Sequence, residues 1–266
     1  MNMQNLTKGT QRPYIGSAAW GRLHGGRLTG PEQVLFALQT VYAQLKQSVR
    51  HASRREQHVS ARFNRIDLAR IALPDTSTVM EALDLVHRTT PDWVCRHTLR
   101  TWSWAMIFSQ IDDLKPDHET LAVSCLLHDL ALTQTDKQPV AQGCACFAIE
   151  GATRAGRFLS SQQWDHTRIH VVEAAICLHM NPEVTLREGV EAHLLHEAAA
   201  LDVVGARLGE IPAHILELVL ECQPREHFKS HMAAAMQQHA SACPSGRTAA
   251  LWRLGLGRAI RHSGWT

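Results

Sequence analysis

The stretch from residue 121 to residue 133, LAVSCLLHDLALT, constrains the fold of this chain more than any other. It is apolar almost all round, which is typical of a helix that is buried on every side. At its end it places His128 and Asp129 side by side. An imidazole and a carboxylate are costly to bury unless each has a partner, and a metal cation would satisfy both. The stretch therefore predicts a metal site whose other ligands come from elsewhere in the chain.

The overall composition is that of an ordinary globular protein, with 266 residues, 45% of them hydrophobic and 20% charged. This length allows one sizeable core. The formal net charge of +2 does not require a nucleic-acid or anionic-membrane partner, so we expect neither. The unusual feature is the number of histidines, 17, which makes a metal site more plausible.

The seven cysteines are scattered and include no CxxC pair. Cys95, Cys125 and Cys177 lie within apolar helical patterns and are expected to be small buried hydrophobic residues. No apolar run is long enough to span a bilayer, and the first residues lack the apolar segment of a signal peptide. The sequence therefore predicts a cytoplasmic protein in a reducing compartment.

Apolar residues recur at helical spacing along most of the chain, and no pair of strands with hairpin turns is evident, so the sequence predicts an all-α fold. We expect an N-terminal extension over residues 1–73, a helical domain over 74–210, and C-terminal helices over 211–266 that pack on the same domain. The extension contains an irregular segment, a helix opened by Pro31 and a basic stretch over 50–65, interpreted as a solvated linker or helix face rather than a nucleic-acid site. From Pro74 onward, the predicted helices are Val79–Arg88, Asp92–Ile111, one opened by Pro116 and Asp117, Ile149–Ser160, His166–His179, Val190–Leu208, Pro212–Cys222, Arg225–His239 and Arg247–Ile260.

Three helices besides the central one carry a polar group on an otherwise apolar face. His97, His179 and Asp202 each align at helical spacing with residues expected in the core. Any one of them alone is more often a hydrogen-bonded core residue than a ligand. The interest lies in their order on consecutive helices.

That order, His97, then His128 and Asp129, then Asp202, resembles the HD-domain superfamily of metal-dependent hydrolases. In that family these four positions bind a catalytic metal inside a helical bundle, so the resemblance implies an HD-domain bundle here. The strings PDWVCRHTLRTW, LLHDLALT, EGATRAGRFL, AAICLHMNP and LDVVG are similar to the cyanamide hydratase-like branch, whose reference reaction converts cyanamide into urea. The resemblance therefore implies an enzyme that uses metal-activated water on a small nitrile- or amide-like substrate.

The sequence departs from that branch at three positions. Trp102 stands where the branch has an aromatic residue that carries a hydroxyl group, Ala131 stands in place of a glycine, and Ala148 stands in place of a glutamate. Two-metal members carry an extra histidine where this chain has Phe147. We therefore expect one divalent ion, with Zn favoured by the resemblance and Fe or Mn also suited to two imidazoles and two carboxylates.

Several residues near the expected ligands are assigned roles. His179 is the candidate for proton transfer. An equally weighted alternative is that His179 is a structural partner of Asp129 or Asp202. Asp129 is expected to contribute to catalysis as well as to binding the metal. Residues expected to bind substrate or to support the ligands are Arg100, Thr133, Trp102 and Phe147.

Two other functions remain open from the sequence. A nucleotide or phosphoester hydrolase of the same superfamily would need cations around the phosphate, but residues 130–133 carry none. A diiron oxygenase is disfavoured by Phe147. A non-catalytic scaffold with a structural metal stays open because of Ala148 and the basic stretch over 50–65. Oligomeric state is open, since Trp252 and Trp265 suit an interface as well as a core.

Overall fold

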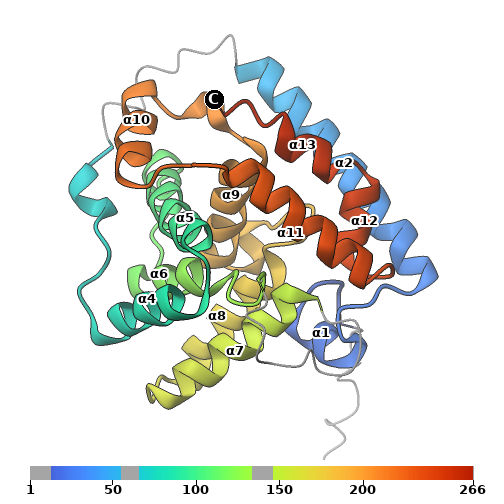
Figure 1. Ribbon diagram of the computed structural model, residues 1–266, viewed down its shortest axis with the longest axis horizontal. Helices are drawn as coiled ribbons and strands as arrows, with labels where there is room; N and C mark the ends of the chain where they lie inside the picture. Colours follow the sequence, from blue (N-terminus) through green and yellow to red (C-terminus); the bar gives the residue numbers. More distant parts are fainter. Residues whose placement is uncertain (1–12, 55–65, 134–145, 266) are drawn as a thin grey trace, which may run out of the picture.

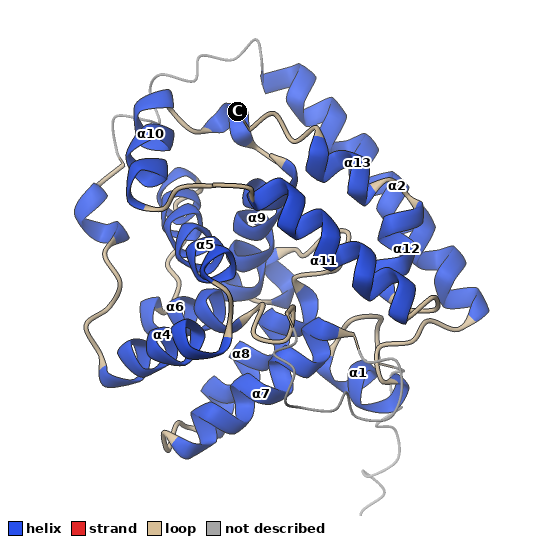
Figure 2. Cartoon of the chain, in the orientation of Figure 1, coloured by secondary structure: helices blue, strands red, loops and turns tan. Residues whose placement is uncertain are grey.

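The computed structural model describes residues 13–54, 66–133 and 146–265, with residues 47–54 described by their backbone alone. Within these ranges the chain is all-helical and forms no strand (Figure 2); an isolated bridge between Arg27 and Gly246 is the one β-type pairing there. The all-α prediction is confirmed for this part of the chain. The helices are α1 (Ala18–His24), α2 (Gly30–Arg54), α4 (Ser77–Thr89), α5 (Asp92–Ile111), α6 (His118–Leu127), α7 (Phe147–Ser161), α8 (His166–Leu178), α9 (Val190–Val204), α10 (Ala213–Cys222), α11 (Phe228–Ala242), α12 (Arg247–Arg253) and α13 (Leu256–Arg261), with short 3-10 turns η1 (Leu68–Ile71), η2 (Leu186–Glu188) and η3 (Leu208–Glu210).

Helices α5, α6, α8 and α9 form the centre of the molecule (Figure 1). α5 packs on α6 and α9, and α8 packs on α6, α7 and α9. The largest cluster of buried apolar side chains lies between these helices. Every histidine and carboxylate predicted as a ligand comes from one of these four helices or from the residue or two directly after one. The HD-domain bundle itself stays an expectation.

Helix α6 ends earlier than the apolar stretch suggests. Asp117 caps its N-terminus by accepting from the Thr120 amide, as expected, but the helix stops at Leu127. The backbone then tightens into turns, in which the amide of Leu132 donates to the carbonyl of Asp129. His128 and Asp129 therefore leave the helix and both reach α5. Gly151 of α7 packs against this turn, because a Cβ there would lie 3.2 Å from the His128 carbonyl oxygen.

Other boundaries differ where local backbone chemistry ends a helix. The sequence predicts that α9 runs to Leu208, but the helix stops at Val204 because Gly205 adopts the left-handed conformation, with φ 73°. The last predicted helix is divided in two by Gly255, which has φ 99°. Thr76 caps α4, ahead of the expected Ser77 or Thr78.

The N-terminal helices are attached to the C-terminal ones. Trp20, Leu28 and Phe36 form a small buried cluster with Ala250 of α12. The division into parts at residues 73 and 210 stays a prediction. The basic stretch 50–65 falls outside the residues whose side chains are described.

Cys95, Cys125 and Cys177 are buried and free, as predicted. Cys243 is disulfide-bonded, which the scattered cysteine pattern did not predict. Disulfides persist mainly in oxidising compartments, so this bond does not favour the reducing compartment expected from the sequence. Among the described helices, none combines the length and the hydropathy needed to traverse a bilayer.

Candidate metal centre

Three of the four predicted ligands meet in the buried centre of the bundle. His97 from α5, His128 directly after α6, and Asp129 each offer one atom to a group compact enough to hold a metal ion. The Nε2 atoms of His97 and His128 lie 3.2 Å apart. Oδ2 of Asp129 lies 3.4 Å from each of those nitrogens. All three side chains are at most 3% exposed.

The other ring nitrogen of each histidine is held by a hydrogen-bond acceptor. Nδ1 of His97 donates to Oδ2 of Asp202 at 2.7 Å, and Nδ1 of His128 donates to the Cys125 carbonyl at 2.8 Å. That carbonyl belongs to the last turn of α6, where backbone oxygens lack helical partners. A neutral imidazole carries one proton, so both Nε2 atoms are left as lone-pair acceptors.

Two lone pairs that face each other at 3.2 Å repel unless a cation or a proton lies with them. Metal-binding histidines commonly donate their second ring nitrogen to a carboxylate or a backbone carbonyl in this way. Ligand atoms at 2.0–2.2 Å from a tetrahedral zinc lie about 3.3–3.6 Å apart, close to the three spacings seen here. The second oxygen of Asp129, Oδ1, is buried without a hydrogen-bond partner. These observations fit a bound divalent ion.

Asp202 lies behind His97 rather than beside the other three residues. Its Oδ2 accepts from His97 and from Arg100 at 2.9 Å, while its Oδ1 accepts from Arg100 at 2.9 Å, Arg225 at 2.6 Å and Trp104 at 3.2 Å. Because these donors occupy both oxygens, the geometry does not offer Asp202 as a fourth ligand. The expected set of four becomes three candidate ligands, with Asp202 as the acceptor that orients His97.

The electrostatics reflect this arrangement. Burial opposes the charged form of Asp202, but Arg100 and Arg225 outweigh it and hold its pKa well below the usual range. Burial likewise opposes ionisation of Asp129, yet attraction from His128 and contact with His97 lower its pKa. Burial lowers the pKa of His128. For His97 the hydrogen bonds to Asp129 and Asp202 outweigh burial and raise the pKa. The two carboxylates are therefore held ionised, and a proton is favoured on His97 but not on His128.

His179 flanks the group of three. It follows α8 directly, and its Nδ1 donates to the Ile176 carbonyl at 2.6 Å, which leaves Nε2 as an acceptor. That Nε2 lies 3.7 Å from Oδ1 of Asp129. Burial, and then the neighbouring His128, lower the pKa of His179 to about 3. His179 is therefore neutral near pH 7, and its Nε2 is a hydrogen-bond acceptor there.

The residues predicted to bind substrate lie in different surroundings. Arg100 is fully buried against Asp202. The Trp102 indole donates to the Ile71 carbonyl at 2.6 Å, so it belongs to the packing around η1. Thr133 carries a buried hydroxyl that has no hydrogen-bond partner. The buried ring of Phe147 lies 5.8 Å from the His179 ring.

Two residues of the centre, Arg225 and Phe228, escaped the sequence analysis. Arg225 binds Asp202 and lies over the rings of Phe228 and Trp265. Phe228 packs on His97, with ring centroids 5.1 Å apart. Both lie at the junction of α10 and α11, which no motif marks. Trp104 of α5 lies on the same inward face as His97, and its indole donates to Asp202.

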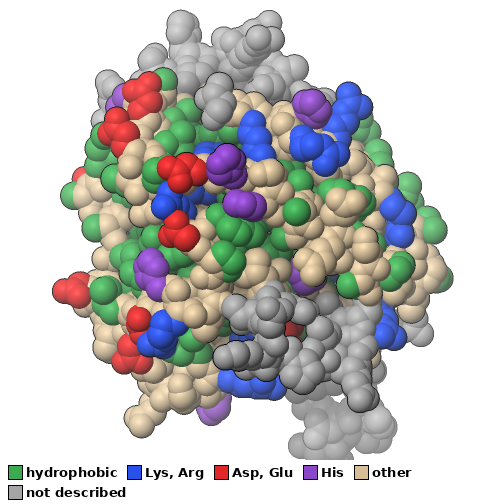
Figure 3. Space-filling model, in the orientation of Figure 1, with side chains coloured by type: hydrophobic (Ala, Val, Ile, Leu, Met, Phe, Trp, Pro, Cys, Tyr) green, Lys and Arg blue, Asp and Glu red, His purple; other side chains and the backbone are tan. Residues whose placement is uncertain are grey.

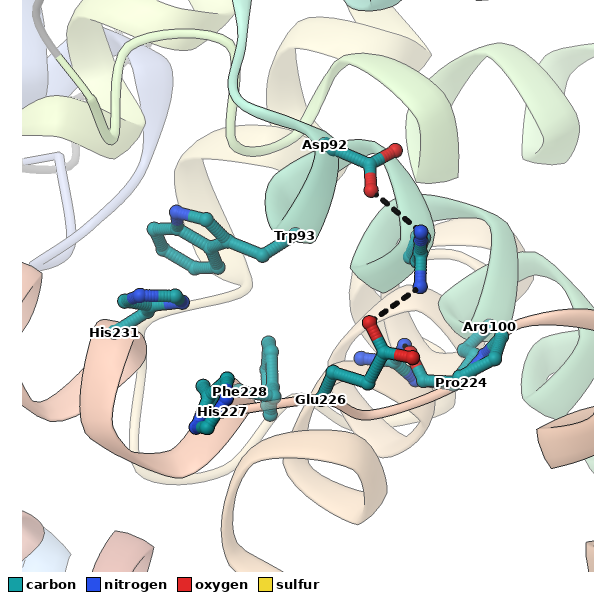
Figure 4. A pocket seen from close by; sticks show the side chains of 9 residues that line it. Asp92, Trp93, Arg100, Pro224, Glu226, His227, Phe228 and His231 are labelled. Atoms are coloured by element: carbon teal, nitrogen blue, oxygen red, sulfur yellow. Dashed lines mark hydrogen bonds and ion pairs between the residues drawn. The ribbon is translucent and has the colours of Figure 1, made fainter.

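A surface cavity of about 220 Å³ lies between the first turns of α5 and the start of α11 (Figure 4). Trp93 and His231 lie on one side of it, with ring centroids 5.6 Å apart. Arg96 pairs with Asp92 at 2.7 Å and with Glu226 at 3.3 Å, and thereby links α5 to the loop before α11. Phe228 lines this cavity and also packs on His97, but none of the three candidate ligands lines the cavity.

No protein-family model matches the chain, and the comparison with curated proteins finds no match either. The functional assignment therefore rests on the geometry of the centre and on the motifs of the sequence.

Proposed function

We propose that this chain is a metal-dependent hydrolase or hydratase that holds one divalent ion through His97, His128 and Asp129. The observation that carries the proposal is the pair of Nε2 atoms 3.2 Å apart, each with its ring proton directed to an acceptor on the opposite edge. Two imidazoles and one carboxylate are also the ligand set of catalytic zinc sites that keep a position open for water. Zn is the favoured metal, with Fe or Mn as alternatives.

A divalent ion at this position would lower the pKa of its bound water to about 7. The protein's own residues would do the rest. Arg100 and Arg225 hold Asp202, and Asp202 fixes the tautomer and orientation of His97. His179, neutral and with Nε2 free to accept, is placed to take a proton beside Asp129.

Several features favour a small uncharged substrate over a phosphoester. The four residues after Asp129 are Leu130, Ala131, Leu132 and Thr133, and the first three are buried apolar side chains. Arg100 and Arg225 both engage Asp202. Transfer of a phosphoryl group needs cationic side chains that stabilise its negative charge in the transition state. Because Arg100 and Arg225 are paired with Asp202, they do not supply such charges. The resemblance to the cyanamide hydratase-like branch points to nitriles and amides, with hydration of cyanamide to urea as the first reaction to test.

Phe147 supports a single metal. Its ring occupies the side of His179 that faces α11, where it lies 5.0 Å from the His239 ring. An apolar ring cannot coordinate a second ion at the position where two-metal members of the superfamily carry a histidine. Among the described residues, one group alone has the compactness of a metal site.

The test is a substrate screen on metal-loaded protein with small nitriles, small amides and a nucleotide panel. We expect product from a nitrile or an amide, urea from cyanamide included, and none from a matched His128→Ala variant. Phosphate release from nucleotides without turnover of nitriles or amides would replace the proposal with a phosphohydrolase. Metal binding without turnover of any substrate would favour a scaffold with a structural metal.

A further inference from the structure

Helix α2 carries an apolar stripe on its outward face. Val34, Leu38, Val41 and Leu45 follow one another at spacings of four, three and four residues, and Leu35 and Tyr42 lie beside them. These six side chains are between 43% and 63% exposed. Figure 1 shows α2 as a long helix along the edge of the molecule, and Figure 3 shows hydrophobic side chains along that edge.

The opposite face of α2 packs against the rest of the protein. Phe36 and Thr40 are buried, and Phe36 packs with Trp20, Leu28 and Ala250. Glu32, in the first turn, accepts from the Trp20 indole at 2.8 Å and from the Thr29 amide at 2.8 Å. The helix is therefore fixed by its inner face, and the outer stripe makes no contribution to the core.

The outer stripe has the spacing of a helix–helix seam. Apolar residues separated by alternating steps of three and four form the a and d positions of paired helices. No charged residue occurs from Gln33 to Leu45. Lys46, the first charge after the stripe, pairs with Glu183 of the same chain. Two such faces can meet without repulsion between like charges, which is what a twofold interface between identical surfaces requires.

We propose that the α2 stripe pairs with the α2 stripe of a second copy of this chain. Fully burying a Leu or Val side chain stabilises a protein by about 1.5–3 kcal/mol. At about 25 cal/mol per Å² of buried apolar surface, this energy corresponds to roughly 60–120 Å² of apolar area for each side chain. Six side chains that are about half exposed thus contribute roughly 200–400 Å² per copy, which is enough for the apolar core of a weak interface. The dimer is accordingly concentration-dependent. This inference is independent of the metal centre.

A membrane surface fits the same stripe less well. Helices that lie in a bilayer interface carry lysine or arginine on the face opposite their apolar residues. In α2 the opposite face is buried inside the protein, and the stripe is flanked by uncharged residues such as Gln39. A second uncharged stripe complements this surface better than anionic lipid does.

Sedimentation equilibrium on the full chain, between about 1 µM and about 100 µM, brackets a micromolar Kd. We expect the wild type to move from one chain mass of 29.7 kDa toward twice that mass. Leu38→Glu, at the middle of the stripe, should weaken the dimer more than tenfold, because it places an unpaired charge in the apolar seam. Leu218→Glu is the matched control, since Leu218 is 42% exposed on α10; it should leave the dimer unchanged.

A mixing experiment separates stripe-on-stripe pairing from other contacts. Leu38→Glu and Leu38→Lys should each be monomeric alone and should form a mixed dimer when combined, because position 38 is central in either helix orientation. Circular dichroism confirms that each variant keeps its helices. A monomeric wild type at the highest concentration, a dimeric Leu38→Glu, or a mixture that stays monomeric would each overturn the proposal. So would binding of wild type, but not Leu38→Glu, to phosphatidylserine vesicles in the absence of any dimer.

Discussion

His97 donates its Nδ1 proton to Asp202 at 2.7 Å, and this one contact determines what the rest of the ring can do. Because the proton is committed to the carboxylate, Nε2 faces His128 and Asp129 as a lone pair. Asp202 can serve in this way because Arg100, Arg225 and Trp104 stabilise its charge in a fully buried position. The relationship explains why Asp202 lies behind His97 rather than within the group of His97, His128 and Asp129.

Replacement of Asp202 by asparagine should weaken metal binding without abolishing it. An amide can still accept from His97, but it no longer balances two buried arginines. We expect metal affinity to fall about 10–100-fold, as is typical for loss of an outer carboxylate. A competition titration with a chromogenic chelator measures this. Affinity reduced beyond detection, with the fold intact, would instead make Asp202 a direct ligand.

Replacement of His179 by glutamine should separate catalysis from metal binding. The ring lies 3.7 Å from Asp129 and is neutral near pH 7, because burial lowers its pKa to about 3. We expect turnover to fall about 10²–10⁴-fold, the usual contribution of a positioned acid or base, with metal content unchanged. Steady-state kinetics on the substrate found in the screen provides the readout. Unchanged turnover would reduce His179 to a packing residue.

Metal removal should destabilise the fold. Without an ion, the two Nε2 atoms 3.2 Å apart must share a proton or separate. A ligand at 100 times its Kd adds about 2.7 kcal/mol of stability, so a chelator should lower the Tm of the wild type by several degrees. His128→Ala is the control, and its Tm should not respond to the chelator. Equal Tm values of wild type with and without chelator would contradict this prediction.

Asp117, which caps the N-terminus of α6, should stabilise the fold when the pH is above the pKa of its carboxyl group and not when the pH is below it. Burial opposes the charge of Asp117, yet hydrogen bonds from Thr120 and the Arg168 contact lower its pKa below the ordinary value for an aspartate. A lowered folded pKa gives stability that is present above about pH 4 and is lost as the pH falls through the folded value. Asp117→Ala should therefore cost about 1 kcal/mol near pH 7 and much less near pH 2.

Urea unfolding at both pH values measures that difference. Asp75→Asn, which removes an exposed carboxylate elsewhere, should show no comparable dependence. If the cost of Asp117→Ala were the same at the two pH values, the carboxylate charge would not be what stabilises the start of α6.

The helical periodicity of the sequence predicts most of this fold because apolar faces are local patterns. Helix α5 has the predicted bounds, and the buried position of His97 follows from its spacing with Val94, Thr101 and Trp104. Helix ends are harder. Gly205 and Gly255 end helices through positive φ angles that depend on what packs around them.

The candidate site is only partly predictable for a similar reason. Residue spacing indicates that Asp202 points inward, but it cannot tell whether a buried carboxylate faces a metal or two arginines. Arg225 is the deciding partner, and it lies after Pro224 in a segment without periodicity. The partnership of Asp202 and Arg225 exists only in the folded chain.

Elemental analysis of the purified protein tests the central claim most directly. Protein dialysed against Zn²⁺, Fe²⁺ or Mn²⁺ and then freed of excess metal should retain about one ion per chain, and Asp129→Ala should retain none while keeping its helices by circular dichroism. Two ions per chain, no ion in the wild type, or full retention by Asp129→Ala would contradict a single metal held by His97, His128 and Asp129.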